Sequence, residues 1–137
     1  MKSPQRRPRK RSASSGLSKE LTAGIAAALE KKAFDVVVLD LRKASAFTDF
    51  FVICTGSNVR QVQAIAEAVQ AAIGKAGARP ALVEGLGRGE WVLIDYFDFI
   101  VHIFNPETRA FYSLERLWGS AERIAVAEPA PPARAAH

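Results

Sequence analysis

Hydrophobic and polar residues alternate along this chain in blocks whose spacing predicts helices and strands in turn. Leu21, Ile25 and Leu29 recur every four positions after Ser18, a residue type that caps helix N-termini, so a helix is expected here. A second helix is expected where apolar side chains share one face and Gly77 ends the run. The residues on that face are Val62, Ile65, Ala66, Val69 and Ile73.

Short runs of β-branched and aromatic residues between these helices predict five strands. The runs are residues 36–41, 50–55, 81–83 and two within 91–104. Ser113 is expected to cap a last short helix that runs through Trp118. The order helix, two strands, helix, three strands, helix predicts an α/β fold with a mixed five-stranded sheet flanked by helices.

The stretch from Trp91 to Phe104, WVLIDYFDFIVHIF, is the most informative part of the pattern. Its two apolar runs have the character of core strands, and Asp95-Tyr96-Phe97-Asp98 joins them. Two carboxylates and two large rings thus stand where a hairpin turn normally carries small polar residues. Aromatic residues beside charge suit a protein-binding surface as well as an active site, so both alternatives are open.

The positive charge of the chain belongs to its N-terminal segment. Residues 1–16 hold six Lys or Arg and no acidic residue, which leaves 13 basic and 14 acidic residues from Leu17 onward, a formal net charge of −1. Residues 1–16 and 125–137 have the composition of disordered tails, so one domain is expected over residues 17–124. A nearly neutral domain argues against a nucleic-acid-binding face and leaves the basic tail as the segment that would touch phosphates.

Several classes of protein are disfavoured by what the chain lacks. No apolar run approaches the roughly 18 residues that span a bilayer, and a single cysteine, Cys54, lies in an apolar run. A cytoplasmic protein without membrane contact is therefore expected. His102 has no serine or cysteine spaced to form a triad with it, and His137 lies in a tail. We expect no catalytic residue, no metal site and no cofactor.

Gly56-Ser57 is the main candidate for enzymatic chemistry. The pair lies between a strand and a helix, where backbone N–H groups can hold a phosphate, and nucleotidyltransferase active sites begin in this way. Such enzymes also need two carboxylates spaced D-x-D on a strand to hold a metal ion, and no D-x-D or E-x-D occurs in the chain. Asp95 and Asp98 are three apart at a turn and would not point together. A helix cap with a tight turn is therefore the favoured interpretation of Gly56-Ser57.

Three segments in order closely resemble the ribosomal silencing factor family, also called the RsfS or Iojap family. They are residues 48–66 (TDFFVICTGSNVRQVQAIA), 91–104 and 111–118 (FYSLERLW), and the resemblance runs from about Leu17 to Ile124. It implies a nucleotidyltransferase-like fold without catalytic carboxylates. It also implies binding to the large ribosomal subunit through its protein numbered fourteen, which sterically blocks association with the small subunit and represses translation. Family members can be dimers off the ribosome, and organelle relatives assist large-subunit assembly.

By position, the resemblance carries the family's partner-binding surface onto the predicted hairpin. The residues are Trp91, Leu93, Asp95, Tyr96, Phe97, Asp98 and His102. The family usually has glycine where this chain has Phe97, so Phe97 would be strained if that position needs a positive φ. Two alternatives to silencing stay open: a nucleotidyltransferase-like enzyme, and a large-subunit assembly factor that uses the basic tail on ribosomal RNA.

Overall fold

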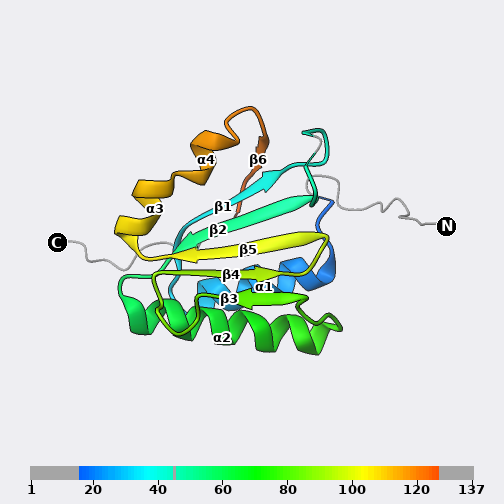
Figure 1. Cartoon of the computed structure of the whole chain (residues 1–137). Helices are drawn as coiled ribbons and strands as arrows, with labels where there is room; N and C mark the ends of the chain where they lie inside the picture. The colour runs from blue at the N-terminus through cyan, green and yellow to red at the C-terminus, as the bar shows by residue number, and fades with distance from the viewer. Residues whose placement is uncertain (1–15, 45, 127–137) are drawn as a thin grey trace, which may run out of the picture.

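In the computed structural model, which describes residues 16–44 and 46–126, one mixed sheet carries helices on both of its faces (Figure 1). The strand order is β3-β4-β5-β2-β1-β6. β2 and β5 are parallel and the other neighbouring strands are antiparallel. The elements in chain order are α1 (Lys19–Glu30), β1 (Phe34–Asp40), β2 (Phe50–Thr55), α2 (Val59–Ala76), β3 (Leu82–Glu84), β4 (Trp91–Asp95), β5 (Phe99–Phe104), α3 (Pro106–Tyr112), α4 (Leu114–Leu117) and β6 (Glu122–Ile124).

The sheet has six strands, so the predicted count of five is corrected. The additional strand, β6, has three residues, two of them charged, and pairs with β1 at the edge of the sheet. So short and polar a segment has no alternation of its own, and pairing with β1 makes it a strand. The predicted tails, 1–16 and 125–137, lie almost wholly outside the described residues, and the predictions made for them stay predictions.

The predicted cap at the start of α1 and the predicted stop at the end of α2 are both confirmed. The side chain of Ser18 accepts a hydrogen bond from the Leu21 N–H at 3.1 Å, and Asn58 caps α2 in the same way. Gly77 ends α2 with a φ of 114°, in the left-handed region that glycine adopts at little steric cost. Both helices lie against the same face of the sheet (Figure 1).

The face of the sheet that α1 and α2 cover carries the larger core. Its strand residues alternate with those of the opposite face, as the period of two in a strand requires. On the helix side they include Val38, Val52, Ile94, Val101 and Ile103. Gly24 lets α1 approach α2 closely, because a Cβ there would lie 2.7 Å from Cδ1 of Ile73.

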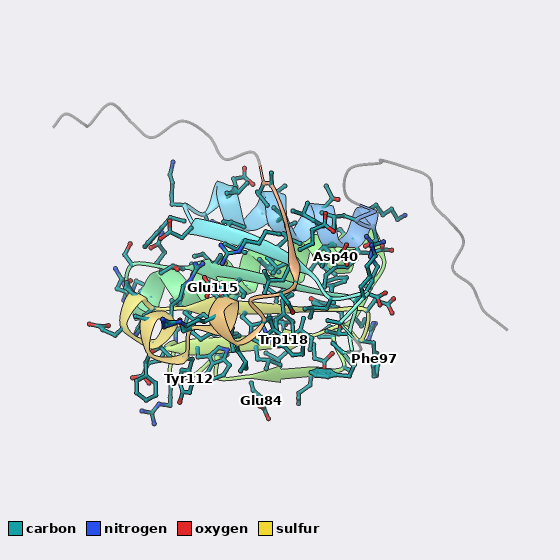
Figure 2. The ribbon with its side chains drawn as sticks, turned by 90° about the horizontal axis from the view of Figure 1, so that it is seen from above. Asp40, Glu84, Phe97, Tyr112, Glu115 and Trp118 are labelled. Carbon is teal, nitrogen blue, oxygen red and sulfur yellow. The ribbon has the colours of Figure 1, made fainter. Side chains whose placement is uncertain are left out.

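The opposite face carries a smaller core, formed by Leu39, Leu41, Phe51, Ile53, Ile100 and Phe104. Leu114 and Trp118, at the two ends of α4, pack against it. Figure 2, seen from above, shows α3 and α4 in front of the central strands, with Tyr112 and Phe97 toward opposite ends of those strands. This partly covered face is the one on which the predicted site residues Trp91 and Leu93 lie.

The predicted short helix after Ser113 is confirmed as α4, with Trp118 as its C-cap, and a further helix that was not predicted, α3, precedes it. Asn105 caps α3: its side chain accepts from the Thr108 N–H at 2.8 Å, and Pro106 opens the helix. Ser113 lies between α3 and α4 with a φ of 49° and makes no side-chain capping bond to α4. A serine in the left-handed conformation cannot aim its hydroxyl at the next turn as an extended cap residue does, so the chain bends there instead.

Candidate functional site

The predicted hairpin is confirmed, with Trp91 opposite Phe104, Leu93 opposite His102 and Asp95 opposite Ile100. Adjacent residues of a strand point to opposite faces of the sheet, and alternate residues share a face. Trp91, Leu93 and Asp95 therefore lie on the face that α3 and α4 partly cover. These three side chains are half-buried. The strand register therefore brings part of the predicted surface together.

The turn at the end of the hairpin is held by hydrogen bonds from two directions. Phe97 has a φ of 71°, the positive value under which strain was predicted at this position. The Asp95 carboxylate accepts from the Phe97 N–H at 2.8 Å, while the Thr48 hydroxyl donates to the Phe97 carbonyl at 2.7 Å. The Asp49 N–H also donates to the Asp98 carbonyl at 3.0 Å. Bonds to the loop before β2 thus keep the strained turn in one conformation.

These bonds present an apolar ring and an acid at the tip of the hairpin. Phe97 is 72% exposed, and the side chain of Asp98 is exposed beside it. Phe47, from the loop that binds the turn, is exposed as well. Large exposed rings on a fixed backbone are typical of surfaces that bind another macromolecule.

Two of the predicted site residues lie beneath the surface. Tyr96 is 6% exposed and its ring stacks on Phe99, with 4.9 Å between ring centroids, in the core next to α1 and α2. Burial raises the pKa of Tyr96 to about 12. His102 is 3% exposed, and burial lowers its pKa to about 4, so the ring is neutral near pH 7. Neither residue can be a principal surface contact in this conformation.

Trp91 is the side chain that links this buried layer to the surface. Its Nε1–H donates to Nδ1 of His102 at 3.1 Å. The indole also packs against Tyr112 and Phe104, with ring centroids 4.6 Å and 5.0 Å away. Trp91 is therefore held on three sides by aromatic and imidazole rings.

A pocket of about 480 Å³ lies beside Trp91 and was not predicted from the sequence. Its walls include Trp91, Tyr112 and Phe111, and the Phe111 side chain is 79% exposed. The aromatic pair on α3 was visible in the sequence, but nothing in the spacing indicated that α3 returns to the start of β4. Gly85 also lines the pocket with a φ of 86°, and a Cβ there would collide with the Trp91 carbonyl oxygen.

The Gly56-Ser57 turn uses its polar groups internally. Oε1 of Gln61 accepts from both the N–H and the hydroxyl of Ser57, the latter at 2.7 Å, and Asn58 caps the first turn of α2. The helix cap expected at Gly56-Ser57 is therefore one residue later, at Asn58, and Gln61 occupies the Ser57 groups that a phosphate would use. Among residues 16–44 and 46–126, no group of three or more His, Cys, Asp or Glu could hold a metal ion.

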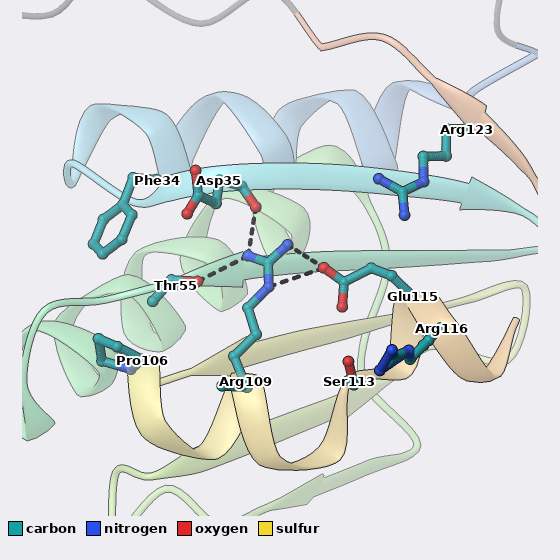
Figure 3. A pocket seen from close by; sticks show the side chains of 10 residues that line it. Phe34, Asp35, Thr55, Pro106, Arg109, Ser113, Glu115, Arg116 and Arg123 are labelled. Atoms are coloured by element: carbon teal, nitrogen blue, oxygen red, sulfur yellow. Dashed lines mark hydrogen bonds and ion pairs between the residues drawn. The ribbon is translucent and has the colours of Figure 1, made fainter. Parts of the chain in front are cut away.

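A second pocket, of about 430 Å³, contains an arginine clasp (Figure 3). The Arg109 guanidinium donates to the Asp35 carbonyl, to the Thr55 hydroxyl at 2.8 Å and, through Nε and a terminal nitrogen, to Glu115. Burial is the largest single influence on Glu115 and would raise its pKa, but the hydrogen bond from Arg109, a backbone hydrogen bond and the charges of Arg109 and Arg123 together hold the pKa below its ordinary value. The clasp ties α3 and the start of α4 to β1 and β2, which is a structural role.

The described part of the chain contains no helix long and apolar enough to cross a membrane.

Comparisons with known proteins bear on the same residues. A family model described as "Ribosomal silencing factor during starvation", RsfS, matches residues 15–137. A ribosomal silencing factor of Halalkalibacterium halodurans is 42% identical over 95 residues, which cover 69% of this chain and 81% of that protein. The Mus musculus protein named mitochondrial assembly of ribosomal large subunit protein 1 is 28% identical over 92 residues, covering 65% of this chain and 40% of that protein.

A crystal structure of a Chromobacterium violaceum protein is similar to this fold with a TM-score of 0.71 and 33% identity. The matched region covers 86% of this chain and 93% of the Chromobacterium violaceum chain. The resemblance seen in the sequence is thus confirmed by likeness in both sequence and structure. Because the family match spans the whole described part of the molecule, this chain belongs to the RsfS family of ribosomal silencing factors.

Proposed function

We propose that this protein binds the large ribosomal subunit, chiefly through its protein numbered fourteen, and sterically blocks association with the small subunit. Family membership supports the silencing role, and the printed name of the mouse relative supports a large-subunit partner. The observation that carries the proposal is the hairpin face, where half-buried Trp91 and Leu93 lead to exposed Phe97 and Asp98 on a braced turn.

The proposed mechanism is competition for space. A folded domain bound at the subunit-joining surface occupies volume that the small subunit needs, so translation is repressed without any bond being made or broken. The proposal therefore gives the protein a cytoplasmic location and no enzymatic activity. Its fold would be nucleotidyltransferase-like, with the carboxylates of such enzymes absent and the Ser57 amide occupied by Gln61.

Charge and aromatic surface would have separate roles in docking. Asp98 places a negative charge at the exposed tip, which suits a basic ribosomal partner and would accelerate and orient the encounter. Trp91 and Phe97 supply apolar area, and aromatic residues of this kind carry much of the binding energy at protein interfaces. Off the ribosome, the same surface would be available for a homodimer, which sedimentation velocity of the free protein would detect.

Co-sedimentation with isolated large subunits tests the proposal. Trp91→Ala and Asp98→Arg should each lose binding while circular dichroism shows the fold intact. Glu67→Arg is the matched control for Asp98→Arg, since Glu67 is exposed on α2, which covers the opposite face of the sheet. If the two hairpin variants sediment with subunits as the parent does, the hairpin is not the interface.

Subunit joining gives the functional readout. Light scattering should show that adding the parent protein to large subunits before small subunits reduces association, and that Trp91→Ala does not. If large and small subunits associate normally in the presence of saturating parent protein, the silencing mechanism is wrong, even when the protein binds the large subunit.

A second candidate is large-subunit assembly through the basic tail, which the name of the mouse relative and the six basic residues of 1–16 favour. Under this alternative, deletion of residues 1–16 abolishes large-subunit binding, whereas silencing through the hairpin leaves most of it. The enzymatic alternative requires nucleotide and Mg²⁺ to bind at Gly56-Ser57 with two carboxylates on the metal, which a structure with both added would reveal.

A further inference from the structure

The hydrogen bond between Trp91 and His102 connects a surface residue to a buried one. The two side chains lie on the same face of the paired strands β4 and β5, and 3.1 Å separates the indole Nε1 from the imidazole Nδ1. His102 is 3% exposed, with the Phe51 ring edge-on to it at 4.5 Å between centroids. Water therefore has little access to this bond, which strengthens it relative to a surface bond.

The direction of the bond determines where the imidazole proton lies. Because Nδ1 accepts from the indole N–H, the neutral ring carries its proton on Nε2. That Nε2 is buried and has no hydrogen-bond partner among the described residues. A buried donor without a partner lowers the stability of the fold, and leucine would remove this donor but leave the indole N–H without its acceptor, so each residue leaves one donor unpaired. Stability alone therefore does not account for a histidine at this position.

The contacts of Trp91 indicate what the histidine does. Tyr112 and Phe104 pack on the indole and confine it, while the bond to His102 selects which edge of the ring faces inward. With its N–H directed at Nδ1, Trp91 borders the pocket of about 480 Å³ without offering that donor to a partner.

We propose that His102 is a positioning residue for Trp91, which it fixes in one orientation so that the indole meets an apolar group of the ribosomal partner. This inference rests on the proposed function, in which Trp91 contacts the large subunit. A ring fixed before binding loses less side-chain entropy on docking, so the bond raises affinity without touching the partner. The partner group beside Trp91 is aliphatic or aromatic, because the one polar atom of the indole is already satisfied.

Two substitutions of the full-length protein separate positioning from packing. His102→Leu keeps a similar volume and removes the acceptor, whereas His102→Asn can place its side-chain oxygen near the position of Nδ1. We expect His102→Leu to raise the Kd for large subunits about tenfold, with little change in the midpoint of urea unfolding. We expect His102→Asn to bind within about threefold of the parent because the acceptor is restored.

The indole N–H resonance supplies a readout in the free protein. The chain has two tryptophans, and Trp118→Phe assigns the Trp91 signal by leaving it alone in the spectrum. Protection of this N–H from solvent exchange should fall in His102→Leu and be kept in His102→Asn. If His102 only filled space in the core, solvent exchange of the Trp91 N–H would not differ between the variant with an acceptor, His102→Asn, and the variant without one, His102→Leu.

A double-mutant cycle covers the case in which His102→Asn fails to fold. Trp91→Phe keeps an aromatic ring and removes the indole N–H, so adding His102→Leu to it should change the Kd by less than about twofold. An equal loss of affinity from His102→Leu in both backgrounds would overturn the proposal.

Trp91→Ala and Asp98→Arg in the same assay distinguish the positioning role of His102 from the proposed function. If Trp91→Ala loses binding while His102→Leu binds as the parent does, the positioning role is wrong and the proposed function stands. If Trp91→Ala binds normally and Asp98→Arg does not, Trp91 is not a contact and the positioning role falls alone. If both variants bind normally, the hairpin is not the interface and both fall.

Discussion

Phe97 is a residue where stability and binding oppose each other. With a φ of 71° and a 72% exposed ring, it carries backbone strain and makes little use of its side chain within the fold. Phe97→Gly should raise the free energy of unfolding by about 1 kcal/mol, because glycine adopts this conformation without a Cβ clash. The same change should weaken large-subunit binding, measured by co-sedimentation.

Phe97→Ala is the control for this prediction. Alanine removes the ring but keeps the Cβ, so it should lose affinity without gaining stability. Equal unfolding free energies for the glycine and alanine variants would show that the turn stores no strain.

His102 should make the fold less stable as the solution becomes acidic. Its pKa is about 4 in the folded protein and 6.5 in a chain where it is solvated, so the unfolded state binds the proton more readily. The stability is then complete above about pH 6.5, declines as pH falls toward 4, and levels off below that value, by roughly 3 kcal/mol in total from this group. Urea unfolding from pH 7.5 to 4 measures it.

His102→Leu is the matched comparison, since leucine has no proton to bind. The difference between parent and variant isolates this group from the carboxylates that titrate in the same range. If the difference in unfolding free energy between the parent and His102→Leu is the same at pH 7.5 and at pH 4, the low pKa of His102 is wrong.

The side chains of the site were predictable only in part. The sequence predicted strain at Phe97 on the condition that its φ is positive, and the structure meets that condition. The burial of Tyr96 and His102 could not be predicted, because it depends on which face of each strand another element covers. Tyr96 follows β4 and turns its ring under the sheet onto Phe99, a contact that no local spacing indicates.

Helices α3 and α4 depend on the Arg109 clasp for their attachment to the sheet. Arg109→Met should lower the free energy of unfolding by about 2–4 kcal/mol, because Glu115 keeps its charge in a partly buried place without a partner. Arg123→Met is the control, since Arg123 lines the same pocket and is exposed. Thermal unfolding followed by circular dichroism compares them, and equal loss in both variants would contradict a specific role for the clasp.

Elements with a strong internal pattern could be predicted, and those without one could not. α2 shows five apolar residues on one face and a glycine stop, and its ends agree with that pattern. β2 is a continuous apolar run because both of its faces are covered. β6 and α3 are short and have no clear periodicity. Pairing with β1 stabilises β6, and the Arg109 clasp stabilises α3.

In the molecule as a whole, we expect the folded domain to determine stability and the basic segment, residues 1–16, to add salt-dependent affinity for large subunits. Deleting residues 1–16 should leave the free energy of unfolding within about 0.5 kcal/mol, because this segment has no large apolar residue after Met1. Affinity for large subunits should fall at low salt and hardly change at high salt, as expected for contacts to phosphates. Filter binding at two salt concentrations measures it, and a loss that is independent of salt would point to a specific contact instead.

The amino-acid sequence established the α/β class, the position of the hairpin and the family, because each depends on local spacing or on motifs read along the chain. It also indicated the tension at Phe97. Only the folded molecule shows that Trp91 lies between His102 and Tyr112, and that α3 completes a pocket beside it. Those contacts join residues from different elements, and the strand register and helix packing that create them are properties of the whole chain folding at once.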